Sequence, residues 1–113
     1  MSLLDSEETI TYEAEMCFNI THNYLVDVMG YSYTYDPHWN MDIYRRDFLG
    51  GAYVMIRRYR KTEKDSDVEP IWFVLYSKLG LKEHTTVVNK VRDIYAIYKE
   101  IREEYLKLGR ECG

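Results

Sequence analysis

The stretch that decides the fold is residues 71–88, IWFVLYSKLGLKEHTTVV. Trp72, Leu75 and Leu79 lie three and four positions apart, so on a helix they form a single apolar stripe. Gly80 stands where such a helix would end, because glycine accepts the left-handed conformation found just past a helix C-terminus. A second helix would open after a short charged turn. The stretch therefore predicts a helix-turn-helix.

Hydrogen-bonding side chains would open the second helix. His84, Thr85 and Thr86 would project from its first turn, the part of a helix-turn-helix that enters a major groove. Imidazole and hydroxyl groups can read base edges there, while Lys82 and Lys90 could meet phosphates. We therefore expect the chain to bind duplex DNA. The alternative is that Thr85 or Thr86 only caps an ordinary helix.

The same residues carry a family resemblance. The run 83–87, EHTTV, followed by Arg92 and Ile94, resembles the signature of the C-terminal DNA-binding domain of the bacterial replication initiator DnaA. In that family an Asp-His-Thr-Thr-Val run opens the recognition helix. The resemblance covers residues 71–95 and implies base contacts in the major groove, with two basic residues in support. The contact residues that it implies are His84, Thr85, Thr86, Lys82 and Arg92.

A rival interpretation makes residues 71–77 a strand, because they are rich in β-branched and aromatic residues. Residues 53–59, YVMIRRY, fit a strand equally well, and the polar segment 61–69 would join the two. Residues 10–20 alternate between apolar and polar side chains, as a half-buried strand does. The helix-turn-helix then disappears, and the C-terminal helix covers a three-stranded antiparallel sheet of 10–20, 53–59 and 71–77. Both interpretations are α+β folds; in the first, N-terminal strands precede the helix-turn-helix and a long C-terminal helix.

The C-terminal helix has an apolar seam whose positions alternate between steps of three and four residues. The seam either packs on the body of its own domain or pairs with a second copy. The first is favoured, because tyrosine is an unusual core residue in a coiled coil. The second predicts a homodimer through Val91, Ile94, Tyr98, Ile101, Tyr105 and Leu108.

Charge divides the chain, which we expect to be a single domain over 1–113. Residues 1–40 hold seven acids and no lysine or arginine, and form an acidic, strand-containing arm. Residues 41–113 hold fifteen basic residues against twelve acids, so this half is the basic, helical, DNA-binding region. Its densest cluster includes Arg57, Arg58 and Arg60, which could bind phosphate. The alternative is a solvated surface. Residues 19–23, NITHN, are also similar to a segment of some uncharacterised phage proteins.

The sequence contains no catalytic or targeting motif that would indicate another function. No phosphate-cradling glycine loop, catalytic constellation or metal-ligand spacing can be assembled, so we expect no enzyme activity, metal or cofactor. Cys17 and Cys112 make no disulfide framework, and no apolar run could span a membrane, which favours a cytoplasmic protein. We therefore expect a small DNA-binding protein, a viral or mobile-element regulator of replication or transcription. The alternative is a non-enzymatic structural or assembly protein that forms a homo-oligomer through its strands and C-terminal helix.

Overall fold

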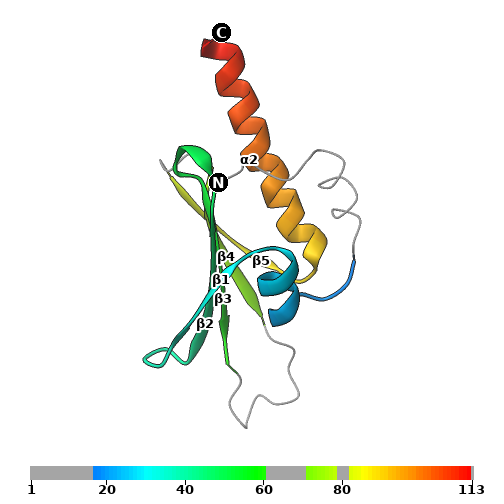
Figure 1. The fold of residues 1–113 in the computed structure, drawn as a ribbon, viewed down its shortest axis with the longest axis vertical. Coiled ribbons are helices and arrows are strands. Elements are labelled where there is room, and N and C mark those ends of the chain that lie inside the picture. The colour runs from blue at the N-terminus through cyan, green and yellow to red at the C-terminus, as the bar shows by residue number, and fades with distance from the viewer. Residues whose placement is uncertain (1–16, 61–70, 79–81, 113) are drawn as a thin grey trace.

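The chain forms one five-stranded antiparallel sheet with a long helix across one of its faces (Figure 1). The computed structural model describes residues 17–60, 71–78 and 82–112, and side chains only as far as residue 107. The strands lie in chain order, each hydrogen-bonded to the next. The elements are η1 (Tyr24–Val28), β1 (Ser32–Asp36), β2 (Met41–Asp47), η2 (Leu49–Gly51), β3 (Tyr53–Tyr59), β4 (Trp72–Ser77), β5 (Glu83–Val88) and α2 (Val91–Cys112).

The helix-turn-helix prediction is wrong, because its first helix is the strand β4 and the residues that would open its second helix form the strand β5. Trp72, Val74 and Tyr76 are buried, whereas the two residues that alternate with them are only half-buried. This is the period of two expected of a strand. β4 pairs along its whole length with β3 and β5. A helix here would leave β3 without that partner and would expose its buried Val54 and Ile56. The predicted resemblance to the DnaA domain is also wrong, because residues 83–88 form an edge strand and open no recognition helix.

The rival interpretation is confirmed in its class and in its two central strands. Residues 53–59 and 72–77 form neighbouring antiparallel strands, and the C-terminal helix covers the sheet. The predicted strand 10–20 lies mostly outside the described residues, as does the connection 61–69. Within the described part, Asn19 makes an isolated bridge with Lys90.

The core lies between the sheet and α2, with η1 closing one side. Four positions of the predicted seam, Val91, Ile94, Tyr98 and Ile101, are completely buried against the chain's own sheet. The favoured intramolecular packing of the seam is therefore what the fold contains. These four residues have no surface left for a second copy. Tyr105 packs against the same core, and the side chain of Leu108 lies outside the described residues.

The turn η2 passes so close to α2 that it tolerates only glycine at one position. Gly50 has a φ of +70°, and a Cβ built on it would lie 2.6 Å from the Tyr105 hydroxyl oxygen. We expect Gly50→Ala to lower the free energy of unfolding by about 1–3 kcal/mol in urea denaturation, from backbone strain and the steric clash. Gly30→Ala is the matched control, because Gly30 has a φ of +76° but no atom within 4 Å of its Cβ position. Equal losses in the two variants would contradict the clash.

Candidate functional site

The residues predicted to contact DNA do not share one surface. Successive side chains of a strand point to opposite faces, so His84 and Thr86 lie on the face that α2 covers while Thr85 lies on the other. Arg57 and Arg58 on β3 are separated in the same way. Duplex DNA binding stays a prediction, and none of the described contacts supports it.

Two of the predicted phosphate-binding arginines instead surround a buried acid. The Arg58 guanidinium lies 2.9 Å from Asp42 Oδ2, and that of Arg60 lies 3.1 Å from Oδ1. The Tyr33 hydroxyl donates a third hydrogen bond, 2.6 Å long, to Oδ1. Burial of the Asp42 carboxyl raises its pKa, but these three hydrogen bonds outweigh burial and hold the pKa below its usual value. The guanidinium of Arg58 also covers the ring of Trp72. These arginines therefore hold β1, β2 and β3 together.

The remaining predicted basic residues lie at the start of α2 and before β5. The Lys90 ammonium donates to Asn19 Oδ1 at 2.6 Å, and the Arg92 guanidinium donates to Cys17 Sγ at 3.4 Å. Both contacts tie residues 17–19 to α2. Lys82 is exposed just before β5. Lys90 and Arg92 therefore have partners within the chain, and Arg92 also forms a long ion pair of 3.9 Å with Asp93.

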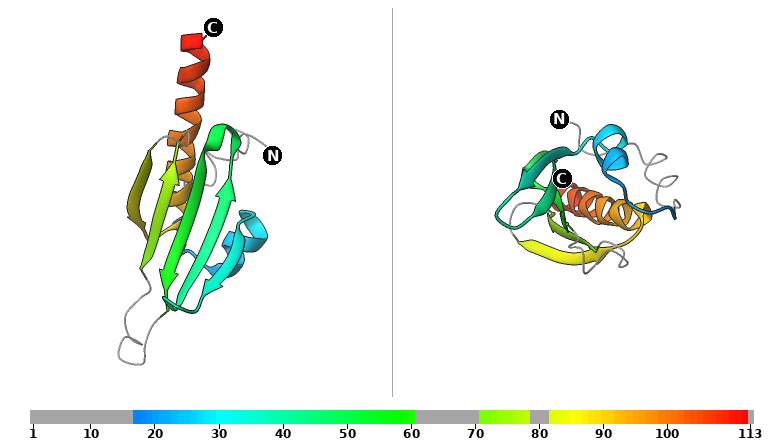
Figure 2. Two further views of the ribbon diagram at one scale, coloured as in Figure 1. Left: turned by 90° about the vertical axis from the view of Figure 1, so that its left-hand side faces the viewer. Right: turned by 90° about the horizontal axis from the view of Figure 1, so that it is seen from below.

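The face of the sheet opposite α2 is apolar and carries no helix among the described residues (Figure 2, left). We call it the outer face. Antiparallel sheets with one free face usually carry polar residues there. Here Met55 of β3 pairs with Leu75 of β4, and the next row runs from Ile43 through Arg57 to Phe73 and Val87. The apolar residues of the outer face are Ile43, Tyr53, Met55, Tyr59, Phe73, Leu75 and Val87.

The outer face also contains an arginine with a buried hydrogen-bond donor that has no acceptor in the structure. Arg57 is half-buried in the central strand, and its Nε atom is buried without a hydrogen-bond partner in the structure. A buried donor without an acceptor costs about 1–3 kcal/mol. Tyr59 and Val87 are 48% and 52% exposed. A contiguous apolar patch of this kind is typical of a surface that another molecule covers.

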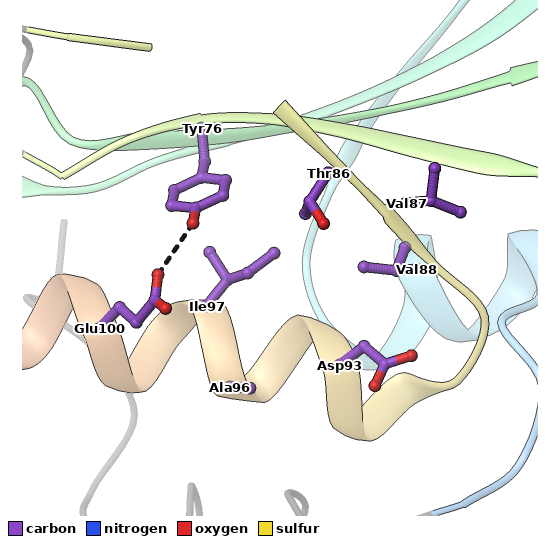
Figure 3. A pocket seen from close by; sticks show the side chains of 8 residues that line it. All are labelled: Tyr76, Thr86, Val87, Val88, Asp93, Ala96, Ile97 and Glu100. Carbon is purple, nitrogen blue, oxygen red and sulfur yellow. Dashed lines mark hydrogen bonds between the residues drawn. The ribbon is translucent and has the colours of Figure 1, made fainter. Parts of the chain in front are cut away.

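A hollow lies at the edge of the sheet, between β5 and α2, and we call it the edge groove (Figure 3). Its cavity volume is about 240 Å³. Asp93 and Glu100 of α2 place carboxylates at its two ends, and the Tyr76 hydroxyl donates a 2.8 Å hydrogen bond to Glu100 Oε2. Burial and this contact raise the pKa of Tyr76 to about 12. The full lining is Tyr76, Thr86, Val87, Val88, Asp93, Ala96, Ile97 and Glu100.

Comparisons with known proteins add no family to these observations. Neither a family model, nor a curated protein, nor a solved structure matches the chain. Among the described residues, no group of three or more histidine, cysteine, aspartate or glutamate side chains is placed to hold a metal ion. The same part of the chain has no helix with the length and apolarity that crossing a membrane requires.

Sequence reasoning missed both surfaces, although one signal for the outer face was present. In a half-buried strand only alternate residues are apolar, yet 53–59 carries large apolar or aromatic side chains at both parities. Tyr53, Met55 and Tyr59 lie on one face, and Val54 and Ile56 on the other. The edge groove has no comparable signal, because its residues come from three elements that only the fold brings together.

Proposed function

We propose that the protein is a non-enzymatic assembly protein that forms a homodimer through the outer face. The single observation that carries this proposal is the apolar group of Ile43, Met55, Phe73 and Leu75 on the outer face, over which the described residues place no helix. Two such faces packed together bury apolar side chains as the two layers of a β-sandwich do. The sequence predicts a homodimer through the α2 seam, or a homo-oligomer through the strands and this helix. The proposed dimer uses the strands alone and leaves the seam inside each copy.

Charge on the outer face favours a second copy as the partner. The face carries Arg45 and Arg57 together with Asp47 and Glu83, and Arg45 pairs with Asp47 at 3.0 Å. A two-fold axis brings a patch onto the same patch of the second copy, so a face with both signs of charge can complement itself. A uniformly charged face would have repelled its own copy.

The size of the face sets the expected strength of the dimer. Five strands about 4.8 Å apart, each about six residues long at about 3.3 Å per residue, make a flat area of about 24 by 20 Å. Stable interfaces bury about 800 Å² of accessible surface per partner. The flat area underestimates the accessible surface, because side chains project from it, but the interface still lies toward the small end of the stable range. We therefore expect a dimer that dissociates in the micromolar range and grows with protein concentration.

Leu75→Glu is expected to abolish the dimer. It places a carboxylate in the centre of the apolar row, where each copy would bury one charge against the other. Sedimentation equilibrium from about 5 to 300 µM should show a monomer–dimer equilibrium for the wild type and a monomer for the variant. Tyr59→Glu, at the exposed end of the same face, should weaken the dimer without risk to the fold.

Val28→Glu is the matched control, since Val28 is a 59% exposed apolar residue on η1, away from the outer face. It should dimerise as the wild type does. A wild-type protein that remains monomeric at 300 µM would overturn the proposal. So would a Val28→Glu variant that loses the dimer while Leu75→Glu retains it.

A further inference from the structure

The edge groove combines two features that suit a peptide in an extended conformation. One is β5 itself, the last strand of the sheet, which among the described residues is paired only with β4. The other is the hollow beneath it, which α2 closes from below (Figure 3). We propose that the edge groove binds an extended peptide that adds to β5 as a sixth strand and places a lysine or arginine side chain between Asp93 and Glu100. This site is separate from the outer face.

Beyond Glu83 and His84 at its start, the edge strand lacks the features that normally prevent pairing. Proteins protect sheet edges with charged side chains, proline or bulges. From Thr85 to Val88, β5 has four uncharged β-branched residues in succession, and it pairs with β4 in an uninterrupted register. Such residues favour the extended conformation that a further strand requires. Main-chain hydrogen bonds from this edge would supply affinity for any extended peptide, as in other cases of strand addition.

The lining of the edge groove selects the side chain. Val88 and Ile97 are buried and make an apolar floor, and Ala96 is an exposed, small residue that leaves the hollow open. Asp93 and Glu100 provide negative charge at either end. Lysine and arginine match this arrangement, because an apolar stem carries a cationic head. An acidic side chain would be repelled by the two carboxylates, and a purely apolar side chain would leave them without a cation.

Both carboxylates keep an oxygen for such a ligand. Asp93 Oδ2 accepts the backbone N–H groups of Asn89 and Lys90, each at 3.0 Å, and so caps α2. Its Oδ1 lies 3.9 Å from the Arg92 guanidinium, beyond hydrogen-bond length. Glu100 uses Oε2 for Tyr76. The two acids are seven residues apart, about 10 Å along α2, so a single cation lying over Ala96 can meet either one.

The test uses the isotope-labelled full chain and a blocked heptapeptide. The peptide carries lysine at its centre, valine two positions to either side and threonine elsewhere, so that lysine and valine share one face of a strand. We expect amide shifts to concentrate in β5 and the first turns of α2 during titration to about 2 mM peptide. Replacing the lysine by norleucine should weaken binding about tenfold, since it keeps the stem and removes the charge.

Two variants separate the charge from the shape of the edge groove. Glu100→Gln keeps an acceptor for the Tyr76 hydroxyl while removing the negative charge, and Ala96→Leu fills the hollow. Each should weaken the lysine peptide about five- to tenfold. Glu103→Gln is the matched control, because Glu103 is an exposed acid on α2 outside the groove, and it should bind as the wild type does.

Three outcomes would overturn the proposal. The first is equal affinity for the lysine and norleucine peptides. The second is unchanged binding to Ala96→Leu. The third is that Nα-acetyl-lysine methylamide, which presents the side chain without a strand, binds as tightly as the heptapeptide. The Leu75→Glu variant should still bind the peptide, so failure of the dimer and failure of the groove can be told apart.

Discussion

Replacing Tyr98 by alanine is expected to lower the free energy of unfolding by about 3–5 kcal/mol, the cost of emptying a fully buried aromatic position. Its ring contacts Phe48 with centroids 5.4 Å apart, and the Arg46 guanidinium lies 5.5 Å from the ring centre. The Tyr98 hydroxyl donates to that of Tyr31, which is itself buried. Alanine therefore leaves a cavity and removes the hydrogen bond that Tyr31 receives in the core.

Urea denaturation followed by circular dichroism measures this loss. Tyr35→Ala is the matched control. Tyr35 is 36% exposed, donates a surface hydrogen bond to Asn40 and lies under the exposed Arg60 guanidinium, so its loss should cost about 1 kcal/mol or less. The difference between Tyr98→Ala and the wild type should not change with protein concentration, because the seam packs within one chain. A loss that appears only above the concentration of dimerisation would show that the seam lies between copies.

The sequence predicts the α2 seam well, whereas it leaves β4 open to two interpretations, a helix and a strand. Val91, Ile94 and Tyr98 form a pattern that only a helix can place on one side. Trp72 and Leu75, by contrast, fit a helical stripe, while Trp72 and Tyr76 fit the buried face of a strand. Short apolar runs satisfy both periods at once. The pairing of β4 with strands on both sides decides between them, and that is a long-range property.

The site is harder to predict, because the partners of the basic residues are distant in the sequence and only the fold brings them together. Arg58 and Arg60 look like a phosphate-binding cluster until β2 brings Asp42 beside them, sixteen and eighteen positions away in sequence. Lys90 meets Asn19 across a separation of 71 residues. Some of the basic residues that are concentrated in the second part of the chain therefore make contacts within the fold.

Asp42→Asn is expected to lower the free energy of unfolding at pH 7 by about 2–3 kcal/mol. Removing one member of a buried ion pair costs about 3–5 kcal/mol, and the loss is smaller here because Arg58 and Arg60 are 27% and 49% exposed and can turn to water. The amide also puts N–H donors where two guanidinium groups and the Tyr33 hydroxyl need an acceptor. Asp47→Asn is the matched control: this acid pairs with Arg45 at 3.0 Å but is 51% exposed, so its loss should cost at most about 1 kcal/mol.

The pH dependence gives the same prediction an independent measurement. The pKa of Asp42 is lower in the folded chain than in the unfolded chain, because its hydrogen bonds to Tyr33, Arg58 and Arg60 outweigh the opposing effect of burial. The unfolded chain therefore takes up the proton first as pH falls, so the stabilisation is complete above about pH 4 and is lost below it, through the folded pKa. Urea unfolding between about pH 7 and pH 2.5 should show the wild type and Asp42→Asn converging in stability at the acid end. A constant difference across that range would mean that Asp42 contributes through packing rather than charge.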